Sequence, residues 1–129
     1  MDADDELVAF AHRMFDLARD GATLALVGYV DAGLSVDLTN QAGDTLLILA
    51  AYHDRPETVR ALLECGADHA RVNDRGQTAL VAAAFRQSNA IEELLAAGAD
   101  PALGSPSAIE VARFFELADV TRRLETGPE

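Results

Sequence analysis

The sequence predicts an all-α solenoid in which short helix pairs stack side by side. The main observation is a polar motif that occurs twice, 33 residues apart, over 33–45 and 66–78. Each copy starts with a glycine that ends an apolar run. Each closes with Asn, two further residues, Gly, one variable residue and Thr. A fixed period of this length is typical of stacked repeats.

The conserved spacing of glycine and threonine between the two copies has a physical explanation. Gly33 and Gly66 can adopt the left-handed conformation that closes the C-terminus of a helix. Gly43 and Gly76 allow the backbone to turn sharply. The threonine that closes each copy is expected to cap the next helix with its hydroxyl. Each motif therefore predicts the end of one helix, a tight loop and the start of another.

The apolar pattern places the helices in order along the chain. A first helix is expected at about 4–19, where acidic residues suit the positive end of its dipole, and a second helix ends at Gly33. Pro56 stands at the start of a later helix, where its missing N–H has no cost. The last helix is expected near 118–126, with Arg122, Arg123 and Glu125 on an outer face. Four leucines are expected in the core of the stacked second helices: Leu62, Leu63, Leu94 and Leu95.

Two further segments of each repeat resemble a known family. Residues 45–51 and 78–84 stand where an ankyrin repeat has its Thr-Pro-Leu-His-x-Ala segment. Residues 59–68 and 91–100 resemble its second helix and Gly-Ala-Asp ending. The chain departs from that proline and histidine at Leu46, Ala79, Ile48, Val81 and Glu110.

The resemblance covers roughly 10–124 and implies an ankyrin-repeat solenoid of about four helix-turn-helix repeats with hairpin-like loops, the fingers. The third finger is expected to be shorter, since it has fewer residues and contains Pro101 and Pro106. We expect one domain over 1–129, with repeats at approximately 4–39, 40–72, 73–103 and 104–126.

Composition excludes several classes of function. The formal net charge of −12 argues against binding nucleic acid through its phosphates, which needs a basic face. No apolar run is long enough to span a membrane, and the acidic N-terminus is unlike a secretory signal. The single cysteine, Cys65, cannot form an internal disulfide. These features predict a cytoplasmic protein that is a monomer and binds neither nucleic acid nor membranes.

Candidate catalytic and metal sites are sparse. Cys65 and His69 are four residues apart, but they flank the helix-ending Gly66, and no second cysteine completes a set of metal ligands. His12 and His53 lie far apart with no serine nucleophile in a recognisable setting. No glycine-rich phosphate loop follows a strand. We therefore predict no enzyme activity, no cofactor, no metal and no small-molecule substrate.

The family resemblance implies where a partner would bind. In ankyrin proteins, the fingers and the first helix of each pair line an extended concave surface that contacts other proteins. The matching positions here are Thr39, Gln41, Ala42, Asp44, Tyr52, His53, Val72, Asp74, Arg75, Gln77, Phe85 and Arg86. In the first and last repeats, Arg19, Asp20, Phe114 and Phe115 correspond less closely.

One line of these positions is rich in aromatic residues. The residue after the first-helix Ala-Ala is Arg19, Tyr52, Phe85 and Phe114 in successive repeats. Aromatic residues and arginine dominate binding hot spots. Regularly spaced aromatics also pack between repeats as part of a core. Both interpretations of the row are compatible with the sequence.

Two functions follow from these observations. The first is a non-catalytic adaptor or scaffold module that binds a partner protein through its concave face and fingers. The alternative is an acidic inhibitor or immunity-type protein that occludes a basic site on a target enzyme. An acidic mimic should lose affinity steeply as salt rises, whereas an aromatic hot spot should not.

Overall fold

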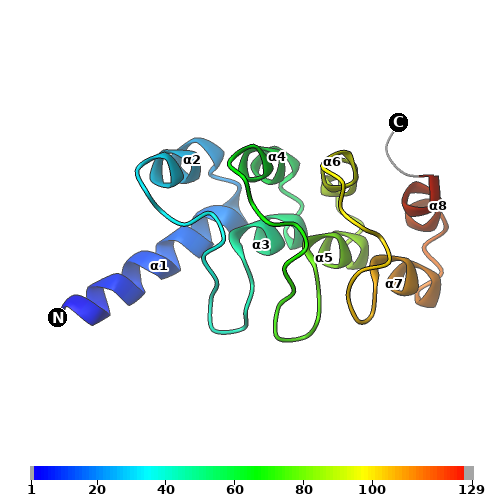
Figure 1. The fold of residues 1–129 in the computed structure, drawn as a ribbon, viewed down its shortest axis with the longest axis horizontal. Helices are drawn as coiled ribbons and strands as arrows, with labels where there is room; N and C mark the ends of the chain where they lie inside the picture. The colour runs from blue at the N-terminus through cyan, green and yellow to red at the C-terminus, as the bar shows by residue number, and fades with distance from the viewer. Residues whose placement is uncertain (1, 127–129) are drawn as a thin grey trace.

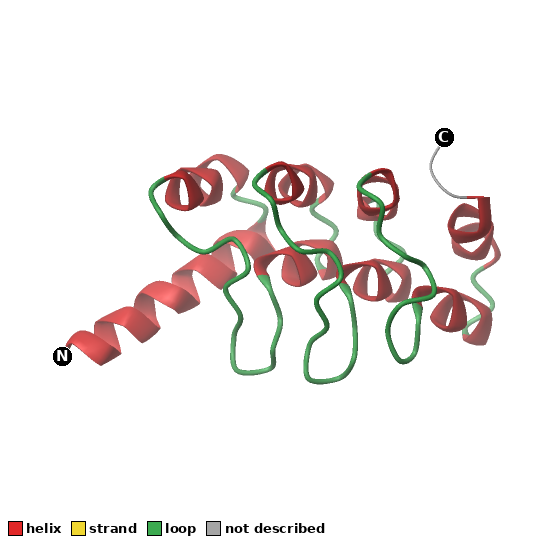
Figure 2. Cartoon of the chain, in the orientation of Figure 1, coloured by secondary structure: helices red, strands yellow, loops and turns green. Residues whose placement is uncertain are grey.

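The structure, a computed structural model, describes residues 2–126. The part of the chain that it describes is all-α, with no strand beyond isolated bridges (Figure 2). Its helices are α1 (Ala3–Asp20), α2 (Thr23–Asp31), α3 (Leu46–Tyr52), α4 (Pro56–Glu64), α5 (Ala79–Phe85), α6 (Ala90–Ala96), α7 (Ala108–Phe114) and α8 (Ala118–Thr126).

The helices form two parallel rows that run along the long axis of the molecule (Figure 1). The odd-numbered helices make one row and pack in order, α1 on α3, α3 on α5, and α5 on α7. The even-numbered helices make the other row. Three loops project from the odd-numbered row, on the side away from the even-numbered helices, and precede α3, α5 and α7. The third is the shortest, as its spacing predicts. These loops are the fingers, and the solenoid architecture is confirmed.

The helices that follow the fingers begin at the predicted hydroxyl caps. Thr45 Oγ1 accepts a hydrogen bond from the backbone N–H three residues on at 3.1 Å, and Thr78 Oγ1 does the same at 3.2 Å. Ser107 caps α7 in the same way, and Glu110 Oε1 accepts from Ser107 N at 3.1 Å. This reciprocal pair gives a role to the glutamate that replaces the family histidine.

The predicted glycine conformations are also present. Gly33 and Gly66 have φ of +115° and +92° just beyond the helices that they end. Gly43 lies in the first finger with φ +78°. A Cβ on Gly43 would come within 3.0 Å of the backbone nitrogen of Asp74 in the next finger. The sharp turn and this close approach both require glycine there.

The first two fingers are joined to each other by hydrogen bonds. The backbone N–H of Asp74 donates to the carbonyl of Ala42 at 3.0 Å. The side-chain amide of Asn73 donates to Asp44 Oδ1 at 2.8 Å. Within its own finger, Asn73 Oδ1 accepts two backbone N–H groups, from Arg75 and Gln77. A single asparagine therefore closes one finger and links it to its neighbour.

The core lies between the two rows of helices. One residue predicted to lie in it is only partly buried. Leu62, Leu94 and Leu95 are buried as expected, but Leu63 is only partly buried. Successive residues of an α-helix point about 100° apart, since 3.6 residues make one turn. Because Leu62 of α4 points directly at the core, Leu63 lies at the edge of it.

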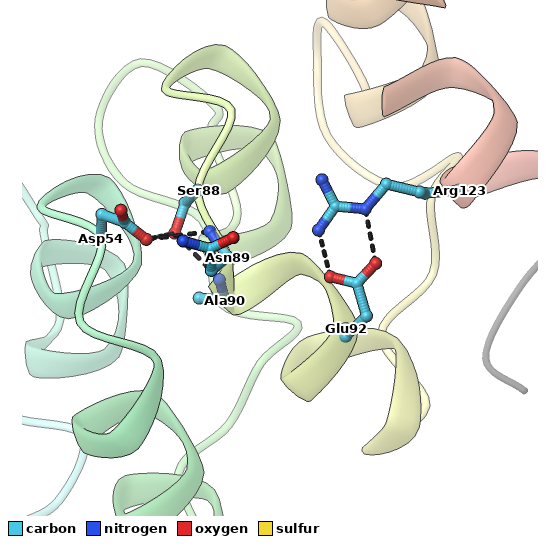
Figure 3. Close-up of polar contacts among 6 residues, drawn as sticks. All are labelled: Asp54, Ser88, Asn89, Ala90, Glu92 and Arg123. Carbon is cyan, nitrogen blue, oxygen red and sulfur yellow. Dashed lines mark hydrogen bonds and ion pairs between the residues drawn. The ribbon is translucent and has the colours of Figure 1, made fainter. Parts of the chain in front are cut away.

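Two polar contacts link successive helix pairs on the side away from the fingers (Figure 3). The carboxylate of Asp54 accepts hydrogen bonds from Ser88 Oγ at 3.2 Å and from the backbone N–H of Asn89 at 2.8 Å. Arg123 of α8 forms an ion pair with Glu92 of α6. Of the three residues predicted on the outer face of this helix, Arg122 and Glu125 are exposed, whereas Arg123 is only partly exposed because it reaches back to the preceding pair.

Candidate functional site

The predicted partner-binding residues come from three places. Thr39, Gln41, Ala42 and Asp44 lie in the first finger, and Val72, Asp74, Arg75 and Gln77 lie in the second. Tyr52, His53, Phe85 and Arg86 lie at the C-terminal ends of α3 and α5. The surface between the fingers and the odd-numbered helices is called here the concave face.

A hollow of about 180 Å³ brings finger and helix residues together on this face. Its apolar lining comes from α3 and α5, and its polar lining comes from both fingers and the end of α3. Five predicted residues contribute to it: Asp44, Tyr52, His53, Arg75 and Gln77. The volume of the hollow is several times the roughly 30 Å³ that one water molecule occupies in the liquid. It is therefore large enough to admit one side chain of a partner.

Asp44 has a different environment from the other finger residues. It is only 8% exposed, and its carboxylate accepts the hydrogen bond from Asn73 of the next finger. A buried carboxylate needs such a partner, because losing its hydration is costly. In the structure, Asp44 therefore joins two fingers at the edge of the hollow.

Four aromatic rings form a continuous line across the ends of α3, α5 and α7, and we call Tyr52, Phe85, Phe115 and Phe114 the aromatic strip. The rings of Tyr52 and Phe85 stack with centroids 6.5 Å apart and planes 12° apart. Phe85 and Phe115 meet edge to face at 5.7 Å, and Phe115 meets Phe114 in the same way at 4.9 Å. Contacts of this geometry are favourable for aromatic pairs.

The fourth repeat differs from the sequence alignment in which ring continues the row. The alignment pairs Phe114 with Phe85, but Phe115 is the residue whose ring contacts Phe85. Phe114 packs beyond it, on the outer side of the strip. The repeat spacing placed Phe115 one position after the aromatic row, and its contact with Phe85 depends on how α7 is set against α5.

Exposure separates the members of the strip. Phe85, Phe115 and Phe114 are 45%, 51% and 79% exposed, respectively. Tyr52 is partly buried against the core, so it also belongs to the packing between repeats. Within the strip, Tyr52 thus packs in a seam between repeats, whereas the three phenylalanines are exposed.

Basic groups lie beside the strip. The guanidinium of Arg86 lies over the Tyr52 ring, 4.9 Å from its centroid, and the His53 ring lies 5.1 Å from Tyr52. Burial, and then the charges of Arg19, Arg86 and Arg55, lower the pKa of His53, while Asp20 raises it. Burial and the neighbouring arginine charges thus both disfavour the protonated form of His53.

Arg19 extends the concave face toward the N-terminus. It pairs with Asp16 at 2.9 Å and lines a second hollow, of about 440 Å³, between α1 and the first finger. Gln41 and Ala42 line the same hollow. The loosely aligned Arg19 thus shares a surface with two of the predicted finger residues.

The described residues hold no group of three or more His, Cys, Asp or Glu side chains that could bind a metal ion. Cys65 caps α4 and His69 lies in the loop that follows, so the pair stays on the side of the even-numbered row. Among the helices within 2–126, none combines the length and apolar character that crossing a bilayer requires.

Comparison with known proteins agrees with this geometry. A family model for ankyrin repeats, in three copies, matches residues 15–104. Over 57 residues the chain is 46% identical to an ankyrin repeat protein of Pseudomonas aeruginosa strain PAO1. The matched segment covers 44% of this chain and 33% of that protein. The match thus spans about a third of the relative's length. The chain belongs to the ankyrin repeat family, whose repeats generally mediate protein–protein interaction and are generally non-catalytic.

Proposed function

We propose that this chain is a non-catalytic interaction module that binds another protein through its concave face. The observation that carries the proposal is the aromatic strip, because three of its four rings are substantially exposed. A single exposed apolar side chain is normal on a protein surface, but a contiguous group marks an interaction site. Phe85, Phe115 and Phe114 contact one another in sequence and so form such a group.

The residue types of the strip support a binding role. Aromatic side chains bury a large area at a low cost in conformational entropy, and with arginine they dominate binding hot spots. Arg86 lies beside the strip on Tyr52. The adjoining hollow offers a place for one partner side chain. Together these features provide an apolar anchor point with polar groups at its border, which is the usual anatomy of an interface.

The test compares capture of partner proteins by the wild type and by a double variant, Phe85→Ala with Phe115→Ala. Each immobilised protein is exposed to an extract of the native host, and bound proteins are identified by mass spectrometry. Losing one hot-spot aromatic costs about 2 kcal/mol or more, so losing two should weaken binding by several hundredfold. The proteins captured by the wild type should be absent from the double variant.

Leu24→Ala is the matched control, because Leu24 is a large apolar residue that is 90% exposed on α2, in the other row. It should capture the same proteins as the wild type. Circular dichroism melts of all three proteins exclude unfolding as the cause. If the double variant melts normally and still captures the wild-type set, binding through the aromatic strip is refuted.

A further inference from the structure

The charges around the aromatic strip differ in sign from the charge of the whole chain. The sequence carries 22 acidic residues against 10 arginines, a net charge of −12. A negative net charge of this size, taken alone, favours a basic partner. On the concave face, however, Arg75 borders the hollow and Arg86 lies over the strip. Within the described residues four arginines form ion pairs, Arg19, Arg113, Arg122 and Arg123, and neither Arg75 nor Arg86 is among them.

Three acidic residues of the finger and odd-numbered helix region are already engaged in other contacts. Asp44 is buried and accepts a hydrogen bond from Asn73. Asp54, which follows His53 in the chain, accepts two hydrogen bonds from Ser88 and Asn89. Asp16 is paired with Arg19. These three carboxylates have partners within the fold, and the guanidinium groups of Arg75 and Arg86 form no ion pair within the described residues.

The charges near His53 act on its pKa. Three arginine charges lower its pKa, from Arg19, Arg86 and Arg55, and one acidic charge, from Asp20, opposes them. Burial acts first and in the same direction as the arginines. Of the neighbouring charges that act on this ring, the positive ones prevail. Three arginines therefore lie near the end of α3, beside the strip.

We propose that the concave face binds an extended segment of its partner that carries a carboxylate next to an aromatic or large aliphatic side chain. This inference rests on the proposed function and specifies the chemistry of the partner. The apolar side chain packs on Phe85 and Phe115 or enters the adjoining hollow. The carboxylate accepts hydrogen bonds from Arg86 or Arg75, since a guanidinium matches the geometry of a carboxylate.

The proposal predicts the peptides that a displayed random-peptide library should yield on the immobilised wild-type protein. Enriched sequences should place Asp or Glu within a few residues of Phe, Tyr, Trp or Leu. The Phe85→Ala, Phe115→Ala double variant should not enrich them. Enrichment of Lys- or Arg-rich sequences, which the net charge would favour, would overturn the acidic-segment proposal while leaving protein binding intact. A library that yields no enriched sequence on the wild type would overturn it as well.

A charge exchange on one enriched peptide provides the second arm. Arg86→Glu should weaken binding, measured by fluorescence anisotropy, by about fivefold, because it removes one exposed ion pair and also places a like charge beside the peptide's carboxylate. Replacing the peptide's acidic residue with Lys should restore binding to that variant. Because Arg86 also contacts Tyr52, Arg75→Glu is tested in parallel as a variant that leaves the strip untouched.

Arg60→Glu is the matched control, since it makes the same charge change on α4, in the other row. It should change the affinity by less than about twofold, because exposed charges are screened beyond the Debye length of about 8–10 Å. Equal effects of the substitutions at Arg60 and at both Arg86 and Arg75 would show that the peptide senses total charge, which refutes the proposal. Equal enrichment by the wild type and the aromatic double variant would instead refute the proposed binding surface.

Discussion

The seam between α3–α4 and α5–α6, the central seam, differs from the seam between α5–α6 and α7–α8, the last seam. Six of the seven residues are buried in α3 and in α5, against three in α7. On the finger side, two hydrogen bonds cross the central seam, Asp74 to Ala42 and Asn73 to Asp44. Across the last seam, Ser105 N donates to the carbonyl of Gly76 at 3.1 Å.

The side away from the fingers shows the same contrast (Figure 3). Across the central seam, the Asp54 carboxylate bonds to Ser88, which is fully buried, and to the backbone of Asn89. Across the last seam, Arg123 meets a Glu92 side chain that is more than half exposed. Exposed ion pairs contribute little to stability. The comparison teaches that burial holds the middle of the stack together, so the C-terminal pair should open first.

Truncation of a central leucine should have the largest effect. Leu62→Ala should lower the free energy of unfolding by about 2–5 kcal/mol, because Leu62 is fully buried between neighbouring pairs. Leu124→Ala, in α8, should instead increase hydrogen exchange in α7 and α8 while leaving the main transition in urea nearly unchanged. Equal shifts of that transition in both variants would mean that the stack unfolds as one unit.

Substitution of a finger glycine tests the central hydrogen bonds. Gly43→Ala should cost about 2–3 kcal/mol, since it combines positive φ with a Cβ pressed against Asp74. Gly66→Ala has a similar φ but nothing within 4 Å of its Cβ, so about 1–2 kcal/mol is expected. Thermal melts of the two variants give the difference. A Gly66 variant as damaged as the Gly43 variant would contradict the role of finger contact.

Two residues at the same place in successive repeats isolate the hydrogen bonds of Asp54. Asp54 and Gln87 both have positive φ, +58° and +52°, which glycine would relieve. Gln87→Gly should leave stability unchanged or raise it by up to about 1 kcal/mol. Asp54→Gly gains the same relief but loses both hydrogen bonds, so it should be about 1–2 kcal/mol less stable than Gln87→Gly. Denaturation in urea compares them, and equal stabilities would show that the carboxylate contributes nothing.

The ion pair of the last seam should give the smallest effect. The hydrogen bond from Arg123 lowers the pKa of Glu92, against the opposing effect of burial. The pair therefore contributes stability above the ordinary pKa of 4.5, and this contribution is lost as pH falls through the lowered value. Glu92→Gln should cost at most about 1 kcal/mol at neutral pH, and less at high salt.

Melts of wild type and Glu92→Gln at neutral pH and near pH 3, each at low and high salt, check this prediction. The difference between the two proteins should shrink in acid and in salt. A difference that persists under both conditions would show that Glu92 stabilises the seam through packing rather than charge.

The sequence predicts where the candidate site residues lie along the chain, but not how they are arranged in space. The repeat spacing placed Tyr52 and Phe85 at equivalent helix ends, and they stack. It could not show that Asp44 is buried under the next finger or that Phe115 continues the strip. Those facts depend on the distance and rotation between neighbouring repeats, which cannot be inferred from the residues of one repeat alone.

The sequence by itself determined the helices, their caps and the period of the stack. These depend on interactions between near neighbours in the chain, such as Thr45 with the N–H three residues on, or the positive φ of Gly66. The tertiary structure decided which charges remain unpaired. Glu92 and Arg123 lie 31 residues apart in the chain yet form an ion pair, while Arg86 forms none within the described residues. Net charge is a sum over the chain, whereas local charge depends on which residues the fold brings together.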